Sequence, residues 1–232
     1  MTGLQPIAYH DGATPLVGHL IRPAGVPRGA VAVFPTFMNI TAGVENKARA
    51  LAAAGFTAFV ADFYGPDSPH DFDSANQAMI RLRADPLAMR RRLRAALTKL
   101  AELEPGAGQA AIGFCLGGMA VLELARDGAD LELVASFHGL LQSPLPAKAP
   151  IRPRILICHG DADFLVPRSH VTAFWEEMDA VKADWHFHSH AGVDHGFTNP
   201  LTPAGAPNPT YNASADRQSW AALNSLLDEV FG

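Results

Sequence analysis

The sequence predicts an α/β fold, in which helices cover both faces of a mainly parallel β-sheet. Short apolar runs rich in Ala, Val, Ile and Phe alternate along the chain with longer segments of helical periodicity. Strands that are buried on both faces have this continuous apolar character, and helices usually connect them. The chain has 232 residues, 48% of them hydrophobic, and no Pro/Gly/Ser-rich linker divides it. We therefore expect one α/β domain, residues 1–232, with a sizeable core.

Three strands and two helices are predicted in the first half of the chain. The run Ala-Val-Ala-Val-Phe at 30–34 ends at Pro35, which cannot continue a buried strand. The helix that follows is expected to stop at Gly55. Residues 66–73 are rich in Pro, Asp and His and are typical of an exposed loop. The predicted strands are 16–21, 30–34 and 57–61, and the predicted helices are 44–54 and 84–102.

The second half repeats the alternation of strands and helices. Its strands are apolar runs, and its loops are rich in Pro or Gly. The predicted strands are 110–112, 131–137, a run beginning at Ile155, and 184–190; the predicted helices are 119–125, 167–180 and 213–231; the predicted loops are 140–153 and 201–212.

The segment Gly113-Phe114-Cys115-Leu116-Gly117-Gly118 joins a predicted strand to a predicted helix. This is the pattern of a nucleophile elbow, usually written G-x-S-x-G, in which a sharp turn presents one side chain at its tip. Small neighbours allow the strained turn and the close approach of strand and helix. A helix N-terminus behind Cys115 favours the thiolate, which is the reactive form. Cys115 is therefore a candidate nucleophile, and an inert core thiol is the alternative.

Acidic and histidine side chains follow two later strands in the order nucleophile, acid, histidine. Asp161 and Asp163 follow the apolar run that begins at Ile155, and His195 follows the strand 184–190. In a catalytic triad the histidine is the general base, and the carboxylate holds its tautomer and stabilises its charged form. Position along the chain leaves both aspartates open, and Asp161 also fits a turn.

With these motifs the chain resembles the dienelactone hydrolase family, a branch of the α/β-hydrolases. The resemblance rests on segment 113–118, on Asp163 within 161–167 and on His195-Gly196-Phe197, and it runs from about residue 30 to the C-terminal helix. It implies an eight-stranded, mainly parallel sheet and a Cys115–His195–Asp163 triad. Asp163 is favoured because the family places the acid just before the Phe-Leu-Val-Pro stretch. It also implies cofactor-independent hydrolysis of a small-molecule ester or lactone, with no metal.

The family pattern places the oxyanion hole at the backbone N–H groups of Leu116 and Phe37. It also reveals two departures. Better-known members carry a glutamate where this chain has Thr36, and an arginine after the catalytic histidine where this chain has Asn199. Arg81 or Arg83, from the expected lid region, could supply a cation instead. Several residues near strand ends could line a substrate pocket, and the alternative is that they pack in the core. They are Thr36, Phe63, Tyr64, His138, Phe164 and Asn199.

Other features argue against several function classes. The formal net charge of −5 gives no case for binding nucleic acid or an anionic membrane. The basic run 90–94 is interpreted as a solvated helix face. His186, His188 and His190 alternate along a strand, and a partly solvated face is favoured over a metal site because no partner ligand is suitably spaced.

Two cysteines do not make a disulfide framework, and Cys158, in an apolar strand, is expected to be inert. Without a visible signal peptide at Met1–Pro6, or any apolar run long enough to span a bilayer, a cytoplasmic protein with reduced thiols is expected. The oligomeric state is not predicted. The alternatives to an ester or lactone hydrolase are a thioesterase or other acyl hydrolase, and a non-catalytic member that binds a ligand or senses thiols.

Overall fold

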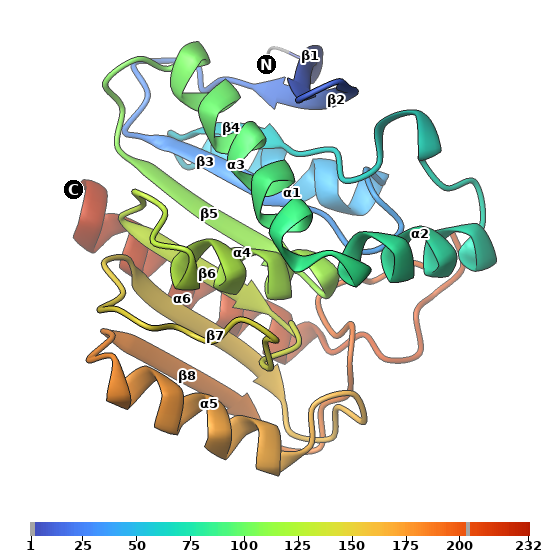
Figure 1. Cartoon of the computed structure of the whole chain (residues 1–232), viewed down its shortest axis with the longest axis vertical. Helices are drawn as coiled ribbons and strands as arrows, with labels where there is room; N and C mark the ends of the chain where they lie inside the picture. Colours follow the sequence, from blue (N-terminus) through green and yellow to red (C-terminus); the bar gives the residue numbers. More distant parts are fainter. Residues whose placement is uncertain (1–2, 203–204) are drawn as a thin grey trace.

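An eight-stranded β-sheet, with strand order β1-β2-β4-β3-β5-β6-β7-β8, forms the centre of the protein (Figure 1). The structure is a computed structural model that describes residues 3–202 and 205–232. The strands from β3 to β8 run parallel to one another, and β2 is antiparallel to β1 and β4. The strands are β1 (Gln5–Asp11), β2 (Thr14–Ile21), β3 (Ala30–Phe34), β4 (Thr57–Val60), β5 (Gln109–Phe114), β6 (Leu133–Phe137), β7 (Arg154–Gly160) and β8 (Trp185–His190).

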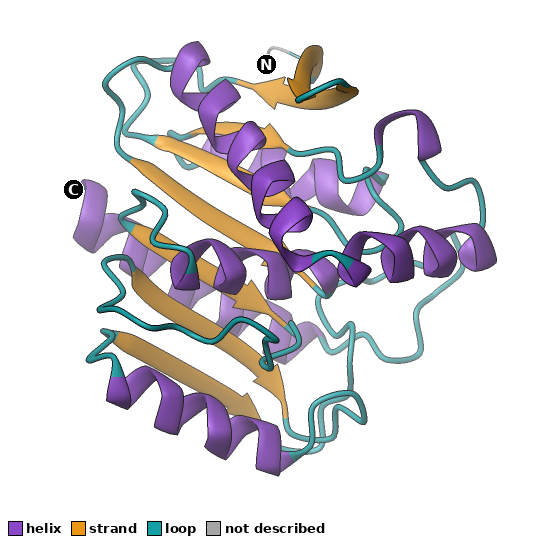
Figure 2. Cartoon of the chain, in the orientation of Figure 1, coloured by secondary structure: helices purple, strands orange, loops and turns teal. Residues whose placement is uncertain are grey.

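Helices cover both faces of this sheet, which confirms the predicted α/β class (Figure 2). α1 and α6 lie on one face, and α3, α4 and α5 lie on the other. α2 extends to the side at which the parallel strands end. The helices are α1 (Ala42–Ala53), the 3-10 helix η1 (Gly65–Asp67), α2 (Phe72–Ala84), α3 (Pro86–Leu103), α4 (Leu116–Arg126), α5 (Arg168–Ala180) and α6 (Ala213–Phe231).

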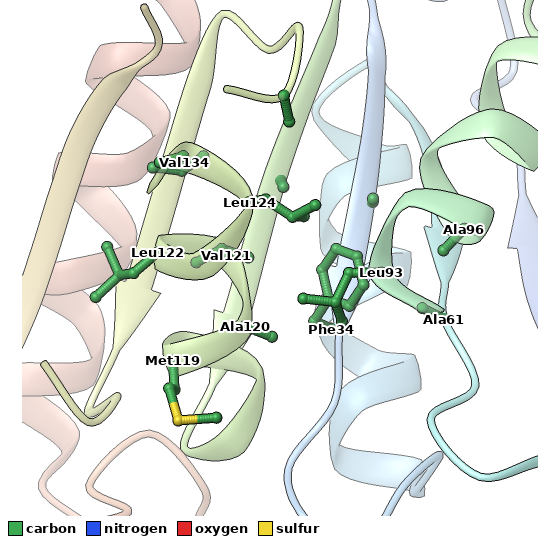
Figure 3. Close-up of a cluster of buried hydrophobic side chains, with 14 of the residues drawn as sticks. Phe34, Ala61, Leu93, Ala96, Met119, Ala120, Val121, Leu122, Leu124 and Val134 are labelled. Atoms are coloured by element: carbon green, nitrogen blue, oxygen red, sulfur yellow. The ribbon is translucent and has the colours of Figure 1, made fainter. Parts of the chain in front are cut away.

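Alternate residues of the central strands enter two separate cores. In β3, Phe34 packs toward α3 and α4, whereas Val31 and Val33 pack toward α1 and α6. Successive side chains of a strand point to opposite faces, so a strand covered on both faces is apolar throughout. Every residue of α4 is buried, and Figure 3 shows its apolar side chains from Met119 to Leu124 beside Phe34. This packing fixes the helix that begins directly after Cys115.

Three elements, β1, η1 and α2, lie outside the sequence predictions. β1 is half-exposed at the edge of the described sheet, so its residues lack a continuous apolar run. α2 covers the end of the predicted loop 66–73 and the start of the predicted helix 84–102. Its N-cap, Asp71, accepts a hydrogen bond from the Ser74 amide at 2.8 Å, and a second N-cap, Asp85, begins α3. Each of these two helices therefore has its own start signal.

The basic run 90–94 is only in part the solvated helix face that was predicted, because Arg91 is exposed whereas Arg90 is buried. Arg90 is 9% exposed and donates to Glu123 Oε2 at 3.0 and 2.8 Å, and to the Leu145 carbonyl at 2.7 Å. Arg92 pairs with Asp11 at 2.7 Å. Burying an arginine requires such partners, because an unpaired buried charge is very costly. These bonds fasten α3 to α4 and to β1.

The remaining predicted strands and helices are present, with bounds shifted by a few residues. Neither predicted loop, 140–153 or 201–212, contains a helix or strand in its described residues. Residues 203 and 204 of the second loop, and Met1 and Thr2 of the N-terminal segment Met1–Pro6, lie outside the described residues. No helix in the described part of the chain is long and apolar enough to cross a bilayer.

Candidate active site

The carboxyl ends of the parallel strands bring most of the predicted site residues to one edge of the sheet. This edge is where open parallel sheets usually bind ligands. A cavity of about 160 Å³, here called the small cavity, lies at this edge. Six predicted residues line it, namely Thr36, Phe37, Cys115, His138, His195 and Asn199.

Cys115 occupies a sharp turn between β5 and α4, with the rare backbone angles φ 55° and ψ −112°. Its amide donates to the Phe137 carbonyl at 3.0 Å, which ties the turn to β6. The flanking glycines are required by close backbone contacts. A Cβ on Gly113 would lie 2.0 Å from the Gly117 carbonyl oxygen, and a Cβ on Gly117 would lie 2.0 Å from that of Phe34. The sharp turn presents the Cys115 side chain to the small cavity.

His195 and Asp163 form a buried pair next to Cys115. His195 Nδ1 lies 2.8 Å from Asp163 Oδ2, and the Asp163 carboxylate is fully buried. The other carboxylate oxygen accepts a hydrogen bond from the Leu165 amide at 2.9 Å, which fixes its orientation. Burial favours the neutral imidazole, but contacts with Asp163 and the Cys115 thiol outweigh it and raise the pKa of His195 to about 10. The pair thus favours a positively charged His195 beside the thiol.

The rival carboxylate, Asp161, is engaged elsewhere. It forms a two-pronged ion pair with exposed Arg168 of α5, with N···O distances of 2.9 and 2.5 Å. The hydrogen bond from Arg168 is the main reason why the pKa of Asp161 lies below its usual value. Of the two aspartates considered from the sequence, it is Asp163 that contacts His195.

Phe37 lies in a turn that neighbouring side chains hold in place. Asn39, in the left-handed region at φ 61°, donates to Asp62 Oδ1 at 2.9 Å. The Tyr64 hydroxyl donates to the Phe37 carbonyl at 3.0 Å. These bonds do not involve the Phe37 amide. The Leu116 amide is at the first position of α4, where a backbone N–H has no acceptor within the helix. Phe37 lines the small cavity together with Cys115, and Leu116 directly follows Cys115 in the chain.

His138 follows β6 and is buried, with φ 42°. Its Nε2 lies 2.9 Å from Thr198 Oγ1, and its ring meets the His195 ring edge-on at a centroid distance of 5.1 Å. Burial, followed by the charge of His195, lowers the pKa of His138 well below its usual value. A neutral imidazole therefore packs against His195.

Three predicted pocket residues lie outside the small-cavity lining. Phe63 is 1% exposed and packs on Phe34, because the chain after β4 turns this ring into the core. Phe164 is 78% exposed, since its neighbour Asp163 takes the inward position. Tyr64 is buried behind Phe37, and desolvation raises the pKa of its phenol far above the usual range. Arg81 and Arg83 are exposed on α2 and are not in the small-cavity lining either.

Lys47 of α1 lines the small cavity and is absent from the sequence predictions. Its Nζ lies 2.8 Å from Asp216 Oδ1 and 5.1 Å from the ring centroid of Trp220, both on α6. The helical spacing of the sequence partly indicates this position, because Lys47 flanks the buried stripe of Val44, Ala48 and Leu51 on α1. Its partners on α6 are far away in sequence and give no local signal.

The other chemically notable side chains lie apart from the site. Cys158 is fully buried, and burial raises the pKa of its thiol to about 12. His186 and His188 are exposed on β8, and His190 Nε2 lies 3.1 Å from Ser219 Oγ. Among the residues that the structure describes, no three His, Cys, Asp or Glu side chains are grouped so that they could hold a metal ion.

Comparisons with known proteins agree with the resemblance seen in the motifs. The model of the dienelactone hydrolase family matches residues 16–231. The solved structure m3DLH is 36% identical, with a TM-score of 0.90, and the match covers 99% of this chain and 98% of that one. The dienelactone hydrolase-like promiscuous phosphotriesterase P91, from metagenomic libraries, is 34% identical with a TM-score of 0.88 and the same coverage. A probable 2-oxo-3-(5-oxofuran-2-ylidene)propanoate lactonase from Bradyrhizobium sp. is 28% identical over 207 residues, which are 82% of each chain.

Proposed function

The chain belongs to the dienelactone hydrolase family, and we propose that it hydrolyses small carboxylic esters or lactones through Cys115, His195 and Asp163. One observation carries this proposal. Cys115, at the tip of the elbow, and His195, held 2.8 Å from the buried Asp163 carboxylate, line the same small cavity. Acyl transfer needs this set of roles: a nucleophile, a base and a group that orients the base.

In the first half of the proposed reaction, the Cys115 sulfur attacks the carbonyl carbon and the thiol proton resides on His195 Nε2. The Leu116 and Phe37 amides donate to the developing oxyanion. Collapse of the tetrahedral intermediate breaks the carbon–oxygen bond. His195 passes its proton to the leaving alkoxide, which leaves as the alcohol, and the acyl group stays on Cys115 as a thioester.

In the second half, water attacks the thioester carbon while His195 accepts a proton from it. Collapse of the second intermediate breaks the carbon–sulfur bond and releases the carboxylic acid. The proton accepted from water stays on His195 and the Cys115 sulfur leaves as the thiolate, which restores the charged pair. Throughout, the Asp163 carboxylate accepts the hydrogen bond from His195 Nδ1 and keeps the imidazole in one orientation.

Activation of the thiol rests on the His195–Asp163 pair, because this chain has no carboxylate at position 36. Thr36 Oγ1 instead accepts a hydrogen bond from the Met38 amide at 3.3 Å. The raised pKa of His195, caused by its contacts with Asp163 and Cys115 against the effect of burial, supports a charged pair without a further acid. The family's glutamate is therefore not required in this proposal.

A panel of small esters and lactones, followed by acid release in a pH-stat, tests the proposal. The wild type is expected to turn over several of them, and Cys115→Ala to lose the activity by roughly 10⁶-fold in kcat, as in other triads. Mass spectrometry of quenched wild-type reactions should find the acyl group on the peptide that contains Cys115. Equal rates for the wild type and Cys115→Ala would refute the proposed nucleophile.

Phosphotriester hydrolysis is a second candidate, favoured by the 34% identity to P91, which is described as a promiscuous phosphotriesterase. Cys115 would then displace an alcohol from phosphorus, with the same two amides facing the phosphoryl oxygen, and water would attack the phosphorus, break the sulfur–phosphorus bond and release the phosphodiester. Release of 4-nitrophenol from diethyl 4-nitrophenyl phosphate, with Cys115→Ala as the control, tests this candidate. The absence of release by the wild type would exclude it.

A further inference from the structure

A second and wider cavity adjoins the small cavity. It has a volume of about 680 Å³, and we call it the large cavity. Met38, Lys47, Thr198 and Asn199 are among the residues that line both cavities, so the two share a wall. The large cavity then continues between α1 and the beginning of α6.

The volumes indicate that the small cavity cannot hold a large substrate alone. Sites that hold drug-sized ligands have volumes of about 300–1,000 Å³. The small cavity, at about 160 Å³, falls below this range, whereas the large cavity, at about 680 Å³, falls within it. A substrate with one small and one bulky group fits if its bulky group extends into the large cavity.

The walls of the large cavity suit an uncharged, aromatic group. Ala50 on α1 and Ala213 and Trp220 on α6 provide apolar surface. The ammonium of Lys47 is neutralised by Asp216, at 2.8 Å, and lies over the Trp220 ring at 5.1 Å from its centroid. Arg217, the other cation of the described lining, is exposed. A planar apolar group can therefore pack here without meeting an uncompensated buried charge.

The position of His195 decides which part of the ester enters the large cavity. His195 protonates the leaving oxygen in the proposed reaction, so the group bonded to that oxygen begins beside His195. The chain that follows His195 forms, at Thr198 and Asn199, part of the wall common to both cavities. The leaving alcohol can therefore extend along this shared wall from the small cavity into the large cavity.

From these observations we infer that the large cavity is the subsite for the alcohol portion of the substrate and takes an uncharged aromatic group. The inference rests on the proposed ester hydrolysis and narrows its substrate class to neutral esters of bulky aryl-bearing alcohols with a small acyl group.

Two substitutions close the large cavity from opposite walls. Ala50→Trp projects from α1 and Ala213→Trp from α6, and neither residue lines the small cavity. Ala101→Trp is the matched control, because Ala101 is an exposed helical alanine on α3, beside the amino end of β5. Thermal unfolding of each variant shows whether it folds, and the second wall variant keeps the test usable if the first one fails to fold.

Three uncharged esters show whether the aromatic group is accepted on the alcohol side or on the acyl side. They are ethyl acetate, with no aromatic group, 2-naphthylmethyl acetate, with a naphthyl group in the alcohol, and ethyl 2-naphthylacetate, with a naphthyl group in the acyl portion. The wild type is expected to prefer 2-naphthylmethyl acetate over ethyl acetate by about tenfold or more in kcat/KM, because the naphthyl group leaves water. Ala50→Trp and Ala213→Trp should abolish this preference and change ethyl acetate turnover by less than about twofold, and Ala101→Trp should change nothing. Uniform losses, a surviving preference, or an effect confined to ethyl 2-naphthylacetate would overturn the inference.

Calorimetric titration with 2-naphthylmethanol, the product alcohol, separates failure of the subsite from failure of the proposed function. If the wild type binds 2-naphthylmethanol and both Ala50→Trp and Ala213→Trp lose this binding, the result supports the subsite. If, in addition, none of the three esters is hydrolysed, the subsite stands and the proposed function fails. Ester turnover without such binding leaves the function standing and refutes the subsite. Tighter binding of 6-carboxy-2-naphthylmethanol than of the uncharged alcohol would overturn the uncharged character assigned to the ligand.

Discussion

The imidazole ring of His138 meets that of His195 edge to face, with 5.1 Å between the ring centroids. The two rings differ in protonation. Burial lowers the pKa of His138, whereas contacts with Asp163 and Cys115 raise that of His195 against the effect of burial. His138 also reaches Thr198, which lies on the chain that leaves His195. The neutral ring can therefore position the charged one.

We first predict that the contact between His138 Nε2 and Thr198 Oγ1 positions His195. His138→Asn, which tolerates the positive φ, and Thr198→Val each remove this contact and should lower kcat/KM by about 10–100-fold, since small misplacements of catalytic groups are costly. Combining them should add little, because both variants break the same bond. Ester kinetics of the two single variants and the double variant provide the measurement. Fully additive losses would mean that each residue acts by another route.

The second prediction concerns stability against pH. The folded-state pKa of His138 lies below its unfolded value of about 6.5, so the unfolded chain binds the proton more readily and stability falls as the pH drops below that value. For His195 the folded pKa, about 10, is higher than the unfolded value. Its contribution is complete below pH 6.5 and is lost as the pH rises toward 10.

Urea unfolding of the wild type, His138→Asn and His195→Asn across this pH range measures both effects. His138→Asn should flatten the acid limb of the stability curve, and His195→Asn the alkaline limb. Three parallel curves would show that neither histidine changes its proton affinity on folding.

The third prediction is that iodoacetamide at neutral pH alkylates Cys115 and leaves Cys158 unmodified. The Cys115 side chain lines the small cavity beside His195, whereas Cys158 is fully buried and its pKa is raised to about 12 by burial. Mass spectrometry of the digested, alkylated protein gives the site. Urea-unfolded protein is the control in which both thiols should react. Earlier labelling of Cys158 in the native protein would contradict the proposed nucleophile.

The fourth prediction separates the two aspartates. Asp163→Asn should lower kcat by about 10⁴-fold, because the imidazole is then held in the wrong tautomer. Asp161→Asn is the matched control. It breaks an ion pair with exposed Arg168 and should change kcat by less than about twofold. Ester turnover by the two variants measures the difference, and the opposite order of effects would transfer the orienting role to Asp161.

The features that the sequence predicts well are local ones. The apolar run of β3 and the glycines around Cys115 each follow from backbone geometry, because burial on both faces and a close approach restrict the residue types. The start of α2 also has a local signal, Asp71 followed by Ser74, but the surrounding Pro, Asp and His residues are typical of a loop.

The features that the sequence does not predict depend on distant contacts or on side-chain direction. The burial of Arg90 depends on Glu123, and the place of Lys47 in the site depends on Asp216. Phe63 and Phe164 both follow strand ends, but Phe63 packs in the core and Phe164 is exposed, so neither ring lines the small cavity. Residue type and order predict Cys115 and His195 as site residues, and the family pattern is needed to prefer Asp163 over Asp161, whereas the pocket around them required the three-dimensional structure.

The last prediction concerns substrate charge. Apart from His195, Lys47 is the one cationic side chain among the described residues that line the small cavity, and its ion pair with Asp216 neutralises it. A neutral ester and its carboxylate-bearing analogue of similar size should therefore have comparable kcat/KM in the wild type. Asp216→Asn frees the ammonium, so the anionic analogue should gain about tenfold, the scale of one hydrogen bond to a charged group. Adding Lys47→Met should remove the gain, and added salt should weaken it. A strong wild-type preference for the anion that is lost in Arg81→Met or Arg83→Met, but not in Lys47→Met, would place the binding cation on α2 instead.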